Sequence, residues 1–321
     1  MRDSSEMTSD PLSDVLDLLH VRCTLSGMFV AGGTWARRFA NLDAIKFCAV
    51  TEGSCWYSVD GLARAVRVEA GDVLVMNGTR SLTLASEESL IADATTTPLE
   101  RDENGNYRVG HGDEFAMLTG MVQIDAEPQA LLVSGLPPII HVRGKTPEAA
   151  PLAWLLQELV TEMKSIARPG GAVAIAGLAQ LLFVHTLRAY LQHAHADDAG
   201  WVKGLGDPRL AEPLRFIHRD PARNWSLDEL AKEAGMSRTS FAVRFREMMG
   251  VPPLTYLTKW RMQLAGRELR SGASIAEAAA AVGYTSESAF SSAFKRFMGV
   301  APGKYRHSSP EARPYPLQLE A

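Results

Sequence analysis

Residues 226–306 contain one short sequence pattern written twice, and this duplication constrains the fold more than any other feature of the chain. In each copy a Ser is followed nine residues later by a Gly. Two Phe residues four apart then precede another Gly by five residues. The first copy begins at Ser226 and the second at Ser274. Repetition of this kind indicates two copies of one supersecondary unit.

Each copy predicts two helices joined by a tight turn. The expected N-cap is the Ser, and a Glu three residues later completes a capping box: Ser226 with Glu229, and Ser274 with Glu277. Gly235 and Gly283 supply the left-handed residue that ends the first helix, and a second helix starts near Ser237 and Ser286. A short turn containing Gly is typical of the helix-turn-helix, whose second helix enters the DNA major groove. The two predicted units cover about 226–250 and 274–299.

A third helix is predicted between the two units. Pro252 and Pro253 favour a helix start, apolar residues recur through Leu269, and Ser271-Gly272 ends the pattern. About eighteen helical residues span roughly 27 Å. A connector of this length suits two reading helices about 34 Å apart, one DNA turn, on one face of the duplex.

This region resembles the AraC/XylS family of transcription regulators. The resemblance is carried by Trp225-Ser-Leu-Asp-Glu-Leu-Ala, Gly235-Met-Ser-Arg, Tyr256-Leu, Trp260-Arg-Met, Gly283-Tyr, Ala289-Phe290, Phe294-Lys-Arg and Pro302-Gly-Lys-Tyr-Arg306. It implies a regulator that binds double-stranded promoter DNA, and contact with RNA polymerase if the protein activates. One position departs from the family pattern, because Ser292 stands where a basic residue is usual.

The candidate DNA contacts follow from the Phe pairs. When these Phe side chains face inward, the opposite face of each second helix is exposed. We expect the following residues to contact DNA: Arg238, Thr239, Ser240, Ala242, Val243, Arg246, Glu287, Ser288, Ser291, Ser292, Lys295 and Arg296. Thr239, Ala242 and Val243 can contact thymine methyl groups. Serines bond to several base edges and discriminate poorly, so the first reading helix is expected to dominate recognition.

Charge is unevenly distributed between the two ends of the chain. The formal net charge is -4, yet residues 203–308 hold 17 Lys or Arg against 10 Asp or Glu, whereas residues 1–202 hold 15 against 25. A basic C-terminal third suits contact with phosphates. The start of the chain does not read as a signal peptide, and polar residues interrupt the most apolar stretch, Ala172 to Leu191. We therefore expect a cytoplasmic protein without a membrane span.

From Val21 to about Val142 the chain predicts short strands separated by turn residues. The turn at Glu69-Ala-Gly71-Asp72 and the following apolar strand resemble a cupin barrel, a sensor domain common in this family. The predicted fold is therefore α+β with two domains: a cupin-like β-barrel with a helical dimerisation segment, then an all-α double helix-turn-helix. The expected boundaries are 11–145 for the sensor, 146–196 for the helical segment, 197–207 for a linker and 208–308 for the DNA-binding domain.

The helical segment carries two apolar stripes. Their members are Leu152, Leu155, Leu156, Leu159 and Met163, and then Ile175, Leu178, Leu181, Leu182 and Leu187. The stripes fit either packing on the chain's own barrel or a homodimer interface, and the family resemblance favours the homodimer.

An enzyme is the most distant alternative. Non-haem iron sites need two His and a carboxylate on one face, and no His occurs between His20 and His111. His193 and His195 point to different sides of a helix. The chain also lacks the Pro-Cys-His-Arg motif of the repair methyltransferases that share this helix-turn-helix pair. We therefore expect no catalytic residues, no metal and no cofactor.

The ligand of the barrel is not readable from the sequence, although candidate residues are. Strand alternation places Phe47, Cys55 and Tyr57 inward around an apolar pocket, and an anionic effector could be matched by a basic side chain. The candidate basic residues are Arg37, Arg38 and Arg80. An alternative is oxidant sensing by the cysteines, which requires exposed thiols of low pKa. Three buried, inert cysteines (Cys23, Cys48 and Cys55) are the simpler interpretation.

Overall fold

The computed structural model describes residues 10–40, 44–62, 64–97, 99–103, 105–124, 136–165, 168–193 and 204–307. The described residues form two compact units, one rich in β-strands and one helical, as the sequence predicted. The β unit comprises strands and helices between Arg22 and His193, and the helical unit comprises residues 204–307 together with an N-terminal helix. Residues 197–203 of the predicted linker lie outside the described residues.

Two sheets form the β unit. Their strands are β1 (Arg22–Gly32), β2 (Ala36–Phe39), β3 (Ile45–Glu52), β4 (Ser54–Val59), β5 (Val66–Glu69), β6 (Val73–Met76), β7 (Leu82–Ala85), β8 (Glu100–Arg101), β9 (Tyr107–Gly110), β10 (Phe115–Gln123) and β11 (Ile139–Val142). The larger sheet has the order β11-β6-β3-β10-β1-β9-β8, and the smaller has the order β2-β7-β4-β5. The chain passes from one sheet to the other at Gly53, whose φ of +71° suits glycine.

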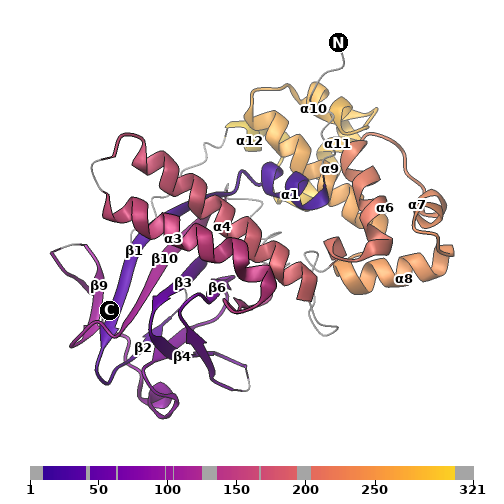
Figure 1. Ribbon diagram of the computed structural model, residues 1–321. Coiled ribbons are helices and arrows are strands. Elements are labelled where there is room, and N and C mark those ends of the chain that lie inside the picture. The colour runs from indigo at the N-terminus through magenta and orange to yellow at the C-terminus, as the bar shows by residue number, and fades with distance from the viewer. Residues whose placement is uncertain are drawn as a thin grey trace. The chain divides into compact units, whose positions relative to one another are not determined.

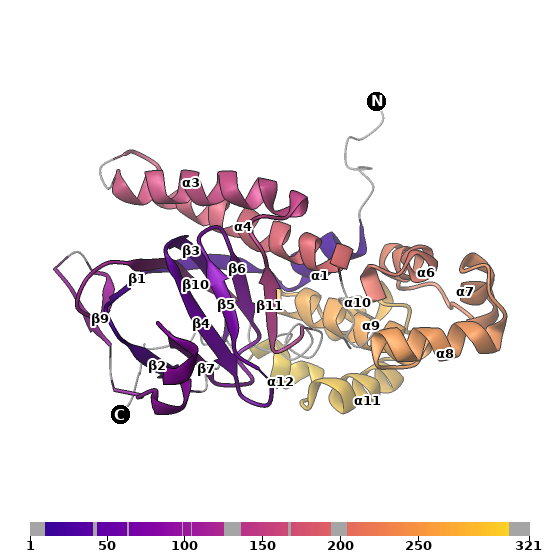
Figure 2. The ribbon, with the colours of Figure 1, turned by 60° about the horizontal axis from the view of Figure 1, so that its bottom comes forward.

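The core of this unit lies between the two sheets. Phe29, Val50 and Met117 from the larger sheet meet Tyr57 and Leu84 from the smaller one in a single buried cluster. Figure 2 shows the strands of the smaller sheet on the side of the larger sheet that is opposite to the helices. The alternation that predicted half-buried strands therefore reflects two sheets that share one apolar interior.

Two helices cover the outer face of the larger sheet (Figures 1 and 2). They are α3 (Ala150–Lys164) and α4 (Gly171–His193), which pack on each other, and α4 also contacts β1, β6 and β11. By length and composition alone, Gly171–Gln192 could cross a membrane. In the fold this helix lies against α3 and the sheet, where Leu182, Phe183 and Leu187 are buried, while Val173 and Leu181 are exposed.

The helical unit contains α6 (Pro208–Arg219), α7 (Leu227–Glu233), α8 (Arg238–Met249), α9 (Pro253–Arg270), α10 (Ile275–Ala281), α11 (Glu287–Met298) and α12 (Pro302–His307). Asp207 caps α6 by accepting the Arg209 backbone N–H at 2.9 Å. Two 3₁₀ segments, η1 (Glu88–Asp93) and η2 (Pro147–Ala149), occur in the β unit.

The first helix, α1 (Pro11–Leu18), belongs to the helical unit (Figure 1). It contacts α6 and α9, and Leu12, Val15 and Leu16 are buried. The predicted boundaries instead grouped residue 11 onward with the sensor. A short amphipathic pattern identifies an apolar face without identifying what covers it, so the sequence could not place α1.

Candidate functional site

Both repeated units begin with the capping box that the sequence predicted. In the first, the Glu229 backbone N–H donates to Ser226 Oγ at 3.2 Å, and the Ser226 N–H donates to Glu229 Oε2 at 2.8 Å. Ser274 and Glu277 form the same pair at 3.2 and 2.8 Å. The hydrogen bond from the Ser226 backbone lowers the pKa of Glu229 to about 2, so this carboxylate stays ionised at the positive end of α7.

Left-handed glycines end the first helix of each unit. Gly235 has a φ of +61° and Gly283 a φ of +81°. The second helices then start after Ser237 and Ser286, whose hydroxyl oxygens accept backbone N–H groups as N-caps. Both helix-turn-helix predictions are therefore confirmed as local structure.

The inner faces of α8 and α11 are built by the Phe pairs. Phe241 and Phe245 are fully buried, as are Phe290 and Phe294. The ring centroids lie 5.6 Å apart in α8 and 5.5 Å apart in α11. Because these rings hold one side of each helix in the core, the opposite side faces outward.

The outer face of α8 presents the predicted contacts of the first unit. Thr239, Val243 and Arg246 are exposed and Ala242 is half-buried. The Val243 side chain is 51% exposed, so its methyl groups are accessible on this face. By contrast, Arg244 is held by Asp207 at 2.7–2.8 Å, so its guanidinium is already paired inside the unit. Two other predicted residues are also exposed: Arg238, which lies 3.5 Å from Asp228, and Ser240.

The outer face of α11 has a different chemistry. Counting from the N-caps, Glu287 corresponds to Arg238, and Ser288 and Ser292 correspond to Thr239 and Val243. The predicted contacts that are exposed are Glu287, Ser288, Ser292, Lys295 and Arg296, and Ser291 is half-buried. The second surface thus offers hydroxyl groups and a carboxylate where the first offers a methyl-rich patch and a cation.

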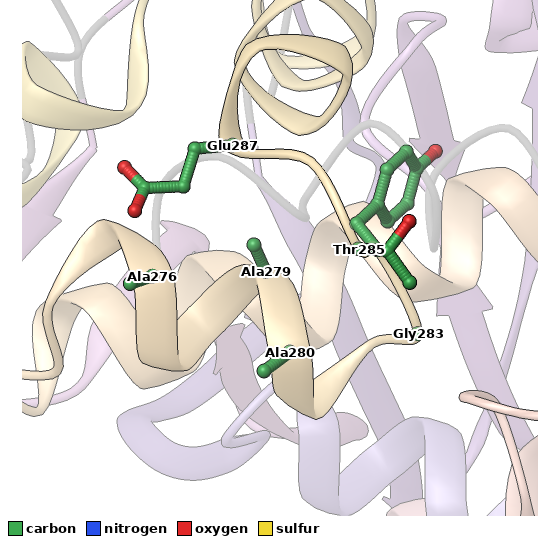
Figure 3. A pocket seen from close by; sticks show the side chains of 7 residues that line it. Ala276, Ala279, Ala280, Gly283, Thr285 and Glu287 are labelled. Atoms are coloured by element: carbon green, nitrogen blue, oxygen red, sulfur yellow. The ribbon is translucent and has the colours of Figure 1, made fainter.

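A hollow lies beside the turn of the second unit (Figure 3). It measures about 490 Å³ and is lined by Ala276, Ala279, Ala280, Gly283, Tyr284, Thr285 and Glu287. The second turn is one residue longer than the first: twelve positions separate Ser274 from Ser286, and eleven separate Ser226 from Ser237. The two units therefore differ in backbone as well as in surface chemistry.

The connecting helix α9 runs from Pro253 to Arg270, 18 residues, which confirms the predicted connector. Tyr256, Leu257 and Trp260 are buried along its first half, and Met262 and Leu269 along its second half. At about 1.5 Å per residue the helix is roughly 27 Å long. Its length therefore remains compatible with reading helices about one DNA turn apart.

A buried polar network lies where α1, α6 and α9 meet. His218 Nδ1 lies 3.1 Å from Asp14 Oδ2, its Nε2 lies 2.8 Å from the Tyr256 hydroxyl, and its ring stacks on Trp260 at 3.9 Å. Burial lowers the pKa of His218, while Asp14 opposes that shift. In the neutral tautomer that fits these partners, Nδ1–H donates to Asp14 and Nε2 accepts from Tyr256. This network was not found from the sequence, because its members are far apart in the chain.

The predicted effector residues lie on different faces of the sheets in the β unit. Cys55 and Tyr57 belong to the inner cluster, as expected, and burial raises the pKa of Tyr57 to about 12. The prediction for Phe47 was wrong. Its neighbour Cys48 belongs to the inner cluster, so alternation puts Phe47 on the outer face of the sheet.

The three candidate arginines also differ in burial and in their hydrogen-bond partners. Arg37 is buried. Trp35, just before β2, belongs to the inner cluster, and Phe39, at the end of β2, packs against it, so alternation puts Arg37 on the same face. Its guanidinium donates to the Thr95 hydroxyl at 3.3 Å, and burial lowers its pKa. Arg38 is ion-paired with Asp60, and the exposed Arg80 donates to the Asp60 carbonyl at 3.0 Å. Arg37 is therefore the candidate that faces the interior.

All three cysteines are free and buried. Burial raises the pKa of Cys23 and of Cys48 to about 12, and it also raises the pKa of Cys55. Thiol oxidation proceeds through the thiolate, which these surroundings suppress. Within the described residues, no group of three His, Cys, Asp or Glu is placed to hold a metal ion. The geometry thus supports the interpretation of inert, space-filling cysteines.

Comparisons with known proteins identify both units. Residues 10–192 match the family described as Cupin, and residues 230–308 match the family described as Helix-turn-helix domain. An AraC-like transcription regulator of Streptomyces lividans is 42% identical over 299 residues, covering 92% of this chain and 98% of that protein. The HTH-type transcriptional regulator AlkR of Acinetobacter baylyi is 28% identical over 309 residues, covering 94% and 100%. The solved DNA-binding domain of AdpA in complex with a target DNA is 34% identical, covering 31% of this chain and 90% of that one, with a TM-score of 0.30.

Proposed function

The chain belongs to the AraC-like transcription regulators with an N-terminal cupin domain, and we propose that its two helix-turn-helix units contribute unequally to DNA recognition. The observation that carries the proposal is the contrast between the outer faces of α8 and α11. Both faces carry exposed residues, but α8 presents Thr239 and Val243 where α11 presents Ser288 and Ser292. The first unit therefore supplies most of the sequence specificity.

On α8, Val243 and Ala242 contact thymine methyl groups, and the Thr239 hydroxyl reaches a base edge. Arg246 and Arg238 hold phosphates, with Ser240 beside the cap. These assignments rest on exposure and on position relative to the buried Phe pair. Base contacts specify sequence, while phosphate contacts set orientation.

On α11, Lys295 and Arg296 bind phosphates. Ser288, Ser291 and Ser292 make hydrogen bonds to base edges, and Glu287 can accept from a cytosine amino group. A hydroxyl both donates and accepts, so it discriminates weakly between bases. The second unit consequently adds affinity more than it adds specificity.

A test of this function starts from the full-length protein and a pool of random duplexes. Repeated selection should yield one site with two half-sites about one helical turn apart. The half-site under the first unit should have the narrower base preference. Recovery of a single short site, or of no preferred sequence, would contradict two-point recognition.

The β unit is the part that responds to a small molecule, in our proposal. Cys55 and Tyr57 line its interior, and Arg37 provides a positive charge there. A buried guanidinium held by a hydroxyl rather than a carboxylate is costly, so a ligand that brings an anionic group would be stabilised beside it. Arg37→Gln should abolish the thermal shift given by such a ligand, whereas Arg38→Gln on the same strand should preserve it.

A second copy of the chain is the partner that we infer for α3 and α4. Trp154 is 57% exposed and Leu181 is 47% exposed, whereas Leu182, from the same predicted stripe, is fully buried inside the protomer. Leu181→Asp should therefore yield monomers in light scattering without unfolding, because it puts a charge in the interface. An unchanged mass would contradict this interface. Contact with RNA polymerase would follow if the protein is an activator.

A further inference from the structure

The loop between α6 and α7 leads directly into the first helix-turn-helix unit. The Trp225 indole N–H donates to the Asp220 carbonyl at 2.9 Å, and the Arg223 guanidinium lies 4.0 Å from the Trp225 ring centroid. These contacts make the loop compact. They do not connect it to the second unit.

Arg261 makes the connection from α9. Its Nε donates to the Pro221 carbonyl at 2.6 Å, and one terminal nitrogen donates to the carbonyls of Arg223 at 2.9 Å and of Ala222 at 3.4 Å. The side chain is half-buried, and burial lowers the pKa of its guanidinium. Hydrogen bonds from a charged donor are stronger than neutral ones, and the planar guanidinium can serve several acceptors at once. Arg261 thus fixes the loop to the connecting helix.

The same loop meets the turn of the second unit. A Cβ atom placed on Gly283 would lie 2.2 Å from the Ala222 carbonyl oxygen. At the equivalent Gly235, a Cβ would meet nothing within 4 Å. Ala222 is therefore in contact with Arg261 and with the second turn, whose glycine is labelled in Figure 3.

We propose that Arg261 is a positioning residue that sets the separation and rotation of the two reading helices. The helix α9 gives the units a common axis, but the segments at its ends, around Gly250 and Gly272, would permit rotation of each unit. The junction of Arg261, Ala222 and Gly283 removes that freedom. The consequence is selectivity for the spacing between two half-sites, and it rests on the proposed reading of DNA by both units.

Three duplexes test this role with the full-length protein. One carries the selected two-part site, one has the second half-site scrambled, and one has a single base pair inserted between the half-sites. The variants are Arg261→Gln, Arg261→Lys and, as a charge control on the same helix, Lys259→Gln. Thermal unfolding is measured for each variant.

Arg261→Gln should bind the scrambled duplex within about two-fold of the wild type and lose about ten-fold on the two-part site. It should also be less sensitive to the inserted base pair. Arg261→Lys keeps the charge but has fewer donors, so its affinity for the two-part site should fall between those of the wild type and Arg261→Gln. Lys259→Gln should leave the ratio of the affinities for the two-part and scrambled duplexes unchanged.

Equal losses on the two-part and scrambled duplexes would overturn the proposal, as would an unchanged penalty for the insertion. If Arg261→Gln does not fold, the same comparison is decided with Arg261→Lys. A wild-type protein that binds the two-part and scrambled duplexes equally would refute two-point recognition itself, which is a different result from failure of the Arg261 variants.

Discussion

The two helix-turn-helix units share their internal structure and differ in what surrounds it. Both have a capping box, a left-handed glycine and a buried Phe pair. Their outer faces and turns are different, since α8 carries Thr239 and Val243 where α11 carries serines, and only the second turn is packed against a loop. The repeated residues therefore build the shared fold, whereas the residues that differ give each copy a different surface.

The largest expected difference between the copies lies at the two glycines. Gly283→Ala combines a left-handed alanine with a clash against the Ala222 carbonyl, so it should cost about 3 kcal/mol. Gly235→Ala has only the conformational strain and should cost about 1 kcal/mol. Urea unfolding of the helical unit, followed by tryptophan fluorescence, measures both. Equal losses of unfolding free energy for the two variants would mean that the contact with Ala222 does not affect stability.

Truncation of the exposed side chains should show the difference in recognition. Val243→Ala should cost about 1–3 kcal/mol at particular base pairs, because a methyl contact is lost. Ser292→Ala, the matched change on α11, should cost less and should change no base preference. Competition binding with single-base-pair variants of the site gives both values. A larger loss for Ser292→Ala would reverse the assignment of the two units.

Acid should weaken the helical unit through the network beside α9. The pKa of His218 is lowered on folding, mainly by burial, so the unfolded chain binds more protons between that lowered pKa and the ordinary value of 6.5. The stability that comes from keeping His218 neutral is therefore fully present above about pH 6.5, and it is lost as the pH drops through that window. His218→Gln should flatten this part of the pH profile in urea unfolding. An unchanged slope would show that another group is responsible.

Two changes in charge on α11 should have the smallest effects. Ser292→Arg adds the basic residue that is usual at this position, and it should raise affinity a few-fold and steepen the salt dependence by about one charge. Lys295→Ala should weaken all sequences about equally and flatten the slope by roughly one. Titrations at several salt concentrations test both. Sequence-dependent losses for Lys295→Ala would indicate a base contact instead.

The sequence predicted the features that depend on neighbours in the chain. The caps at Ser226 and Ser274, the turn glycines and the connector were all readable, because spacing alone determines them. Long-range placement was not readable. The face of the sheet on which Phe47 lies depends on which sheet β3 joins. The position of α1 depends on a partner about two hundred residues away, His218.

The position of α1 also affects any fragment that contains only the residues from 205 onward. Residues 205–308 alone would leave the part of α6 and α9 beneath Val15 and Leu16 uncovered and would deprive His218 of Asp14. The different surroundings of the three candidate arginines could not be predicted from the sequence either. Adjacent residues on β2 alternate, but only the structure gives Asp60 as the partner of Arg38.

The central claim, that the first unit dominates recognition, is tested most directly by a base-pair scan. Every position of the selected site is replaced in turn, and the affinity of the full-length protein is measured at one fixed salt concentration. The largest losses, about 1–3 kcal/mol each, should fall at base pairs under α8, and the losses under α11 should be smaller. A scan whose strongest losses lie under α11 would contradict the claim.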